Sequence, residues 1–201
     1  MQYQKFIKFS IITFVVLGML LLVLPQQWLH TVYHPSFLGI MFLASAVLIY
    51  LPLLISRPSG LVEKSLIIKL QAVIALAFIL NGLGELGLYQ LYQIGFQYDK
   101  LAHLTGSLLF AIVLGEMLAI WKKFSFWQMA WRVALIIFTF GIAWELWEML
   151  SDIFFHTQEW GRYGQHNITD TIGDVMWNCV GIVFALSILR SSLDKEKKAW
   201  N

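Results

Sequence analysis

The sequence predicts an all-α fold: a polytopic membrane protein built as a bundle of six transmembrane helices, forming a single domain over residues 1–201. Composition is the first reason. Hydrophobic residues make up 59% of the chain, charged residues only 13%, and the mean hydropathy is +0.70, whereas about a quarter of the residues of a soluble protein are charged. Length is the second reason, because the chain contains six apolar segments of roughly 20 residues, enough to cross ~30 Å of hydrocarbon.

The apolar segments set the bounds of the predicted helices, which are 7–25, 36–56, 66–89, 101–121, 132–152 and 171–190. The first segment follows Lys5 and Lys8, as the apolar part of a signal peptide would. It ends in LPQQW, without the small residues of a cleavage site, so we expect it to be retained as a helix. No repeat or low-complexity tract interrupts the series, which favours one domain.

Charge and cysteine content exclude several classes of protein. The net charge is only +2 and is spread over several loops, so no basic face predicts a nucleic-acid partner. The single cysteine, Cys179, lies inside the last apolar segment, which excludes an intrachain disulfide and a cysteine-rich metal cluster.

The distribution of basic residues predicts the orientation, because lysine and arginine stay preferentially on the cytoplasmic side. The N-terminus, the second and fourth loops and the C-terminal end together hold 12 of the 14 basic residues, and Lys100 and Arg162 are the other two. Both termini are therefore expected in the cytoplasm.

Acidic residues concentrate in the half of the predicted helices that lies away from the cytoplasm. Eight of the twelve belong to the extracytoplasmic half or its loops: Glu85, Asp99, Glu145, Glu148, Asp152, Glu159, Asp170 and Asp174. Residues three or four apart share a helix face, which gives three polar stripes: Asp99, His103 and Ser107; Glu145, Glu148 and Asp152; Asp170, Asp174 and Asn178. Because ionisable groups inside a bilayer cost several kcal/mol unless they face the bundle interior, we expect the stripes to face one another in a hydrated pocket.

A divalent metal cation of unspecified identity would balance so many carboxylates, and bundle proteins build such sites from inward-facing acids and histidines. The candidate metal ligands are Asp99, His103, Glu145, Glu148, Asp170 and Asp174. Candidate catalytic residues are His103, Glu145 and Glu148, and candidate substrate-binding residues are Asn178, Ser107 and Asp152. Asp99 and Asp170 could equally be helix N-caps, because each stands where a predicted helix begins.

Three motifs carry a resemblance to known proteins: DKLAHLTGSLLF, GIAWELWEMLSD and TDTIGDVMWNCVG. Over roughly residues 80–190 the chain resembles the YjdF-type inner-membrane proteins, a family of uncharacterised function. More distantly it is similar to the VanZ-like family, which shares DKLAH and the spacing of Asp174, Asn178 and Gly181, although Glu148 here stands where that family usually has glutamine. The resemblance implies a multi-pass protein of the bacterial cytoplasmic membrane with a role at the cell envelope.

Three classes of function remain open from the sequence. The first is a metal-dependent enzyme acting on a membrane lipid or a lipid-linked phosphate that enters from the outer leaflet, although no G-x-S-x-G or H-E-x-x-H motif is present. The second is a small transporter or ion-coupled flippase, and the third is a non-catalytic envelope factor that binds a lipid headgroup. The spans become uniformly apolar inward of Ser107, Glu145 and Asn178, which favours a one-sided pocket, and we expect the 153–169 loop to cover its mouth.

Overall fold

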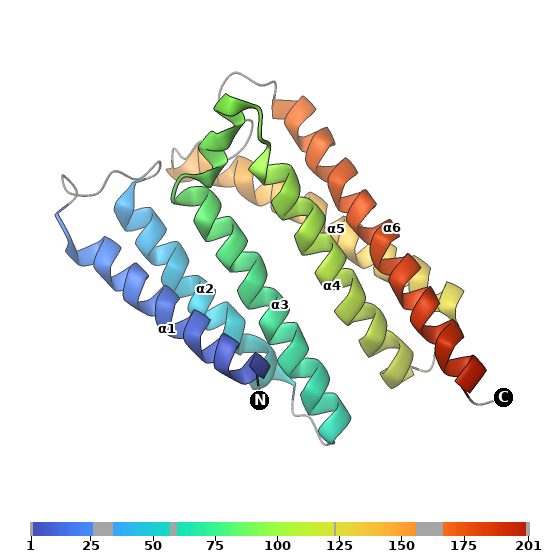
Figure 1. The fold of residues 1–201 in the computed structure, drawn as a ribbon. Helices are drawn as coiled ribbons and strands as arrows, with labels where there is room; N and C mark the ends of the chain where they lie inside the picture. Colours follow the sequence, from blue (N-terminus) through green and yellow to red (C-terminus); the bar gives the residue numbers. More distant parts are fainter. Residues whose placement is uncertain (1, 26–33, 57–59, 123, 156–166, 200–201) are drawn as a thin grey trace. The chain divides into compact units, whose positions relative to one another are not determined.

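The computed structural model describes residues 2–25, 34–56, 60–122, 124–155 and 167–199, and within these ranges every regular element is helical. The described residues form six long helices, labelled in Figure 1, and a short 3₁₀ helix, η2, which lies between α3 and α4. Their bounds are α1 (Gln2–Val23), α2 (Pro35–Ile55), α3 (Leu61–Glu85), η2 (Leu88–Ile94), α4 (Tyr98–Lys122), α5 (Phe126–Phe155) and α6 (Asn167–Ala199). The predicted all-α class is confirmed.

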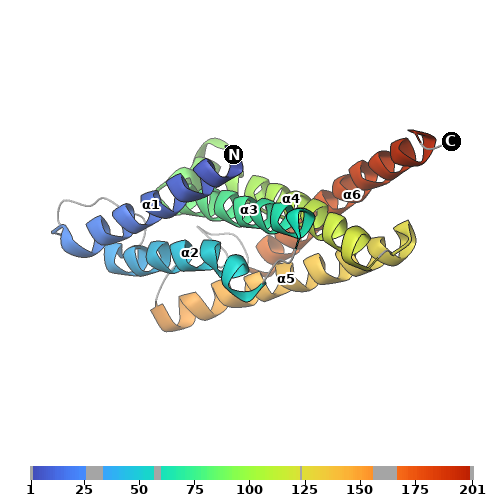
Figure 2. The same cartoon turned by 90° about the horizontal axis from the view of Figure 1, so that it is seen from below.

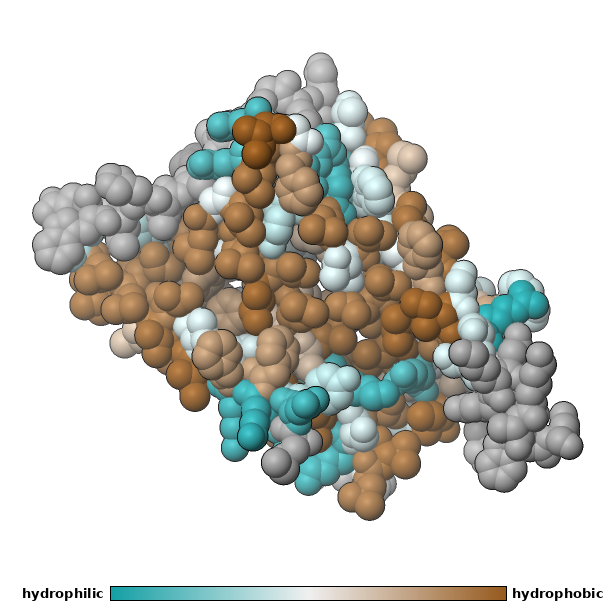
Figure 3. All heavy atoms as spheres, viewed as in Figure 1, coloured by the Kyte–Doolittle hydropathy of each residue, from teal (hydrophilic) through white to brown (hydrophobic). Residues whose placement is uncertain are grey.

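All six long helices are long and apolar enough to cross a membrane. Large apolar side chains on them are exposed, including Phe9, Ile40, Phe140 and Val183. On the face seen in Figure 3, hydrophobic residues cover the middle and hydrophilic ones gather near the two ends. Such exposure suits a lipid environment rather than water, and the chain is a multi-pass membrane protein.

Helix ends differ from the predicted bounds where local backbone chemistry overrides hydropathy. The helix expected at 66–89 ends at Glu85, because Gly87 adopts a φ of +137° that other residues rarely adopt, and η2 follows. The helix expected at 132–152 begins earlier, at Phe126. There the Ser125 backbone N–H donates to Gln128 Oε1 at 3.1 Å and the Gln128 N–H donates to Ser125 Oγ at 3.5 Å, which is a capping box.

The chain divides into two compact units. The first contains α1, α2, α3, η2, the start of α4 through Ala102 and the end of α5 from Ile153. The second contains α4 from His103, α5 through Asp152, and α6. Each unit has its own apolar core. The single domain expected from the sequence stays a prediction.

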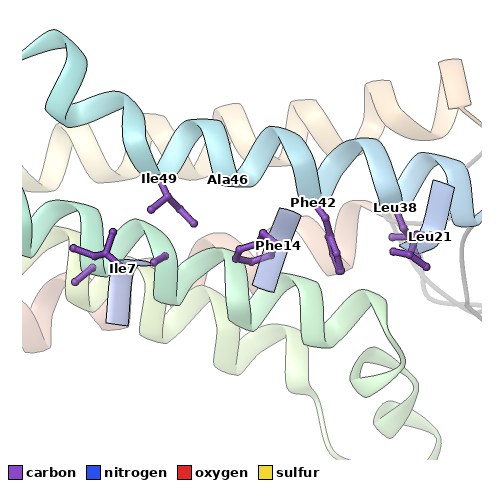
Figure 4. Packing of buried hydrophobic residues seen from close by; sticks show 9 residues of the cluster. Ile7, Phe14, Leu21, Leu38, Phe42, Ala46 and Ile49 are labelled. Carbon is purple, nitrogen blue, oxygen red and sulfur yellow. The ribbon is translucent and has the colours of Figure 1, made fainter. Parts of the chain in front are cut away.

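The core of the first unit lies between α1, α2 and α3, and α1 runs alongside α2 (Figures 1 and 2). Phe14 of α1 packs edge-to-face on Phe42 of α2, with ring centroids 5.4 Å apart, and Leu38 and Ile49 of α2 are fully buried (Figure 4). Gly18 of α1 allows the two backbones to approach closely, because a Cβ there would lie 2.9 Å from the Gly39 carbonyl oxygen. Close approach at small residues is the usual basis of helix packing in membranes.

Replacing Gly18 by alanine is expected to destabilise the first unit by about 1–3 kcal/mol. The added methyl group would collide with the Gly39 carbonyl oxygen, which can move away only if α2 moves with it. Gly106 of α4 is the matched control, since a Cβ there meets nothing within 4 Å. Gly106→Ala should be neutral or stabilising by up to about 1 kcal/mol. Unfolding in detergent measures both variants, and equal midpoints would contradict the predicted helix crossing.

The core of the second unit lies at one end of its helices. It joins Ala111 of α4, three residues of α5 and three of α6: Met129, Val133, Ile137, Ile182, Ala185 and Leu189. These residues lie towards the end of α4 at Lys122 and the beginning of α5 at Phe126. The polar residues of the same helices are therefore left at the opposite end of the unit.

Candidate functional site

Polar side chains are buried in the half of the second unit that lies away from its apolar core. They come from all three helices: Ser107 of α4; Glu145, Glu148 and Ser151 of α5; Asp174 and Asn178 of α6. On each helix these residues are three or four positions apart and so share a face. The polar faces of the three helices are turned inward, as expected for ionisable groups in a membrane bundle.

His103 of α4 is the centre of this group. Its Nε2 atom lies 3.6 Å from Asp174 Oδ1 and 3.8 Å from Glu145 Oε1. The side chains of His103, Glu145 and Asp174 are only 8%, 6% and 1% exposed, respectively. One ring nitrogen from α4 thus approaches a carboxylate of α5 and a carboxylate of α6.

The other ring nitrogen of His103 faces Asn178, whose Nδ2 atom lies 3.3 Å from His103 Nδ1. Asn178 is packed against Gly141 of α5, where a Cβ would lie 2.7 Å from Asn178 Nδ2. Gly141 therefore leaves the space that the amide occupies. The sequence predicts that Asn178 binds substrate, and it indicates no role for Gly141. The glycine could have been noticed only through its place one turn before Glu145.

Ser107 and Gly181 hold α4 and α6 close together. The Ser107 hydroxyl donates to the carbonyl oxygens of His103 at 2.7 Å and Leu104 at 3.1 Å, one turn or less earlier in α4. A Cβ at Gly181 would overlap Ser107 Oγ and lie 2.6 Å from the Leu104 carbonyl oxygen. The structure thus gives the Ser107 hydroxyl a role in helix packing next to His103.

Glu148 and Ser151 continue the polar face of α5 beyond Glu145. The Trp144 indole N–H donates to Glu148 Oε1 at 2.7 Å, which fixes this carboxylate on the helix. Ser151 is fully buried, and its hydroxyl has no hydrogen-bond partner among the described residues. Ser10 and Ser45, by contrast, donate to the carbonyl oxygen one turn earlier in their helices.

Three aspartates that the sequence predicts as site residues lie nearer the ends of the same helices. Asp99 stands in the first turn of α4, one turn before His103, and its Oδ2 lies 3.7 Å from Lys100 Nζ. Asp170 stands in the first turn of α6, one turn before Asp174. Asp152 follows Glu148 by one turn of α5, and all three aspartates are partly buried. Most of the 153–169 loop expected to cover the site, including Glu159, lies outside the described residues.

Glu85 is part of a hydrogen-bond network in the first unit. Its Oε1 accepts a hydrogen bond from Asn81 Nδ2 at 2.7 Å, and the Tyr89 hydroxyl donates to Asn81 Oδ1 at 2.7 Å. Tyr98, the first residue of α4, packs edge-to-face on Tyr89 and donates its hydroxyl to the Leu80 carbonyl at 2.9 Å. These contacts between α3, η2 and Tyr98 fix the beginning of α4 on the first unit.

A metal ion could be held by imidazole and carboxylate groups in this region. Asp99, His103 and Asp174 form a group of three candidate ligands, and a ligand oxygen of Asp99 lies within 4.8 Å of a ring nitrogen of His103. Ligand atoms bound at about 2.1 Å to one ion lie roughly 3.0–3.5 Å apart. The separations of His103 Nε2 from Asp174 and Glu145 are close to this range and longer than a direct hydrogen bond.

Fold and site together define a class: multi-pass α-helical membrane proteins with a buried histidine and carboxylate centre. The chain belongs to the family described as predicted membrane protein (DUF2238), which matches residues 9–195. This membership is consistent with the YjdF-type resemblance of the sequence, whereas the VanZ-like resemblance is not confirmed. No curated protein and no solved structure matches the chain.

Proposed function

We propose that the protein is a membrane-embedded, metal-dependent enzyme that acts on a lipid or lipid-linked phosphate of the bacterial cell envelope. The observation that carries this proposal is that His103 Nε2 lies within 4 Å of both the Asp174 and the Glu145 carboxylates inside a bundle of largely apolar helices. Buried ionisable groups in membrane helices mark functional sites, because their burial is costly without a role or a partner.

The donor set suits a divalent cation. Nitrogen and oxygen ligands on facing helices bind zinc or manganese, and carboxylates alone also bind magnesium or calcium. His103, Asp174 and Glu145 would hold the cation, with Asp99 as a further ligand one turn away on α4. A cation would also offset the excess of carboxylates around the His103 imidazole.

Asn178 would then position His103. A histidine that binds metal through Nε2 carries its proton on Nδ1, and that N–H needs an acceptor. The Asn178 amide lies 3.3 Å from Nδ1 and presents its oxygen when the amide is turned over, since the oxygen and nitrogen of an amide are nearly equivalent in shape. Its role would be to fix the tautomer and the orientation of the ring.

The remaining polar residues suit hydrolysis or transfer of a phosphate ester. A bound divalent cation polarises a phosphoryl oxygen and makes a bound water more acidic. Glu148, held by Trp144, would accept the proton of the attacking water or alcohol as general base. The buried Ser151 hydroxyl, one turn along the same helix face, would donate a hydrogen bond to a substrate oxygen.

The apolar core of the second unit favours an enzyme over a conduit. Ala111, Val133, Ala185 and their neighbours fill the space between the helices at the end of the unit away from His103. A path for ions or headgroups would need polar residues there. With both termini in the cytoplasm, the site would open to the extracytoplasmic leaflet of the bacterial inner membrane, where its lipid or lipid-linked partner would enter.

Metal analysis of the purified protein tests the proposal. After removal of metal with a chelator and reloading with zinc, manganese or magnesium, we expect about one tightly bound ion per chain. Asp174→Asn and His103→Ala should reduce the affinity at least about tenfold. The control Glu63→Gln changes a carboxylate of α3 to an amide, and it should bind the metal with the affinity of the unmodified protein.

Metal content that is far below one ion per chain, and that Asp174→Asn leaves unchanged, would overturn the metal centre. If labelled lipid crosses the bilayer of proteoliposomes in the absence of metal, and is not chemically converted, the protein would instead be assigned to the flippases. Binding of a headgroup without conversion, in the metal-loaded protein, would assign it to the non-catalytic envelope factors.

A further inference from the structure

Two arginines of the second unit lie over aromatic rings at the end away from His103. The Arg132 guanidinium carbon is 4.2 Å from the centroid of the Phe124 ring and 4.3 Å from that of Trp131. The guanidinium carbon of Arg190 is 5.6 Å from the Phe126 centroid and 5.9 Å from that of Trp127. The aromatic residues around the start of α5 thus hold one guanidinium from α5 and one from α6.

The aromatic residues also locate this end of the unit at a membrane interface. α4 ends at Lys122 and α5 begins at Phe126, so the helices reach the edge of the hydrocarbon there. Trp127 and Trp131 are 71% and 54% exposed, as tryptophans in an interfacial belt are. Phe124 and Phe126 pack against the apolar core, which fixes the rings under the two arginines.

Stacking on a ring occupies the face of a guanidinium and leaves its N–H edge available. Arg132 donates one N–H to the Gln128 carbonyl oxygen at 2.6 Å, which fixes its orientation further. Among the side chains that the structure describes, no carboxylate forms an ion pair with Arg132 or Arg190. The rings therefore orient both guanidiniums through their faces, and each N–H edge points away from the ring that it covers.

We propose that Arg132 and Arg190 bind the phosphate of an anionic phospholipid. A guanidinium edge matches two phosphate oxygens in a bidentate pair, and basic sites at the ends of transmembrane helices recognise acidic headgroups. Leu135, which is exposed one turn along α5 from Arg132 and so shares its face, would contact the acyl chains. This surface is distinct from the metal centre, because Arg132 and Glu145 are ~20 Å apart along α5 at helical rise.

Native mass spectrometry of the full chain with phosphatidylglycerol and phosphatidylcholine of matched acyl chains tests this site. The unmodified protein should retain phosphatidylglycerol preferentially. The double variant Arg132→Gln/Arg190→Gln should lose about tenfold or more of that preference. The control Lys5→Gln/Lys8→Gln removes the same charge from exposed positions of α1 and should keep the preference.

Two further measurements separate a guanidinium site from general attraction. Arg132→Lys/Arg190→Lys keeps the charge but loses the bidentate edge, so it should retain clearly less lipid than the arginine protein. Inorganic phosphate at millimolar concentration should not displace the lipid, since the acyl chains also contribute to binding. Equal retention of the two lipids by the unmodified protein would overturn the proposal without any variant, and so would full binding by the lysine variant.

Discussion

Glu148→Gln is expected to reduce turnover of a lipid phosphate by about 10²–10⁴-fold, because an amide cannot accept the proton that a general base removes. The amide still accepts the hydrogen bond from Trp144 through its oxygen, so the local structure should be kept. The measurement is product formation in proteoliposomes that contain a polyprenyl diphosphate or a phospholipid and the metal that the protein binds best, followed by mass spectrometry of the lipid extract.

Two comparisons make the Glu148 result specific. The bound metal should stay at the level of the unmodified protein in Glu148→Gln, and Trp144→Phe, which loses the hydrogen bond but keeps the carboxylate, should show a smaller loss of rate. A Glu148→Gln protein that turns over normally would remove Glu148 from the reaction. One that has lost its metal would make Glu148 a ligand instead of a base.

Gly181→Val is expected to destabilise the second unit by about 3 kcal/mol or more, the upper end for overpacking a core. The added side chain would collide with the Ser107 hydroxyl and with the backbone at Leu104 and Leu108, and the backbone cannot move without separating α4 from α6. Since His103 and Asp174 are on these two helices, the variant should also lose metal.

Unfolding midpoints in detergent and metal content measure the Gly181 variant. Cys179→Val is the matched control, because it also enlarges a side chain of α6 but at an exposed position. Its stability should stay within about 0.5 kcal/mol of the unmodified protein. A Gly181→Val protein as stable as Cys179→Val would show that α4 and α6 do not pack at this point.

Much of the candidate site could be predicted from helical periodicity. Glu145 and Glu148, or Asp174 and Asn178, lie on one face of any helix that contains them, whatever surrounds it. Their position inside apolar spans predicts that this face is turned away from lipid. The burial of all four side chains confirms that inference.

The contacts between helices could not be predicted in this way. Which stripe residues approach one another depends on how each helix is rotated and how closely it packs. Gly141 and Gly181 decide this for Asn178 and Ser107, and nothing in their local sequence indicates the helix that each will meet. The Asn178 amide therefore faces the His103 ring, and Trp144 binds Glu148, where periodicity alone left both open.

The sequence by itself determined that this protein is a six-span helical membrane protein with acidic residues on inward faces. The physical reason is that hydrocarbon leaves the backbone few alternatives to the helix, so apolar length alone fixes the elements. Tertiary structure decided that one nitrogen of His103 approaches both Asp174 and Glu145, and that α3 ends at Glu85 before Gly87. These features depend on close contact between residues far apart in the sequence, or on a single backbone angle. Hydropathy predicts neither of them.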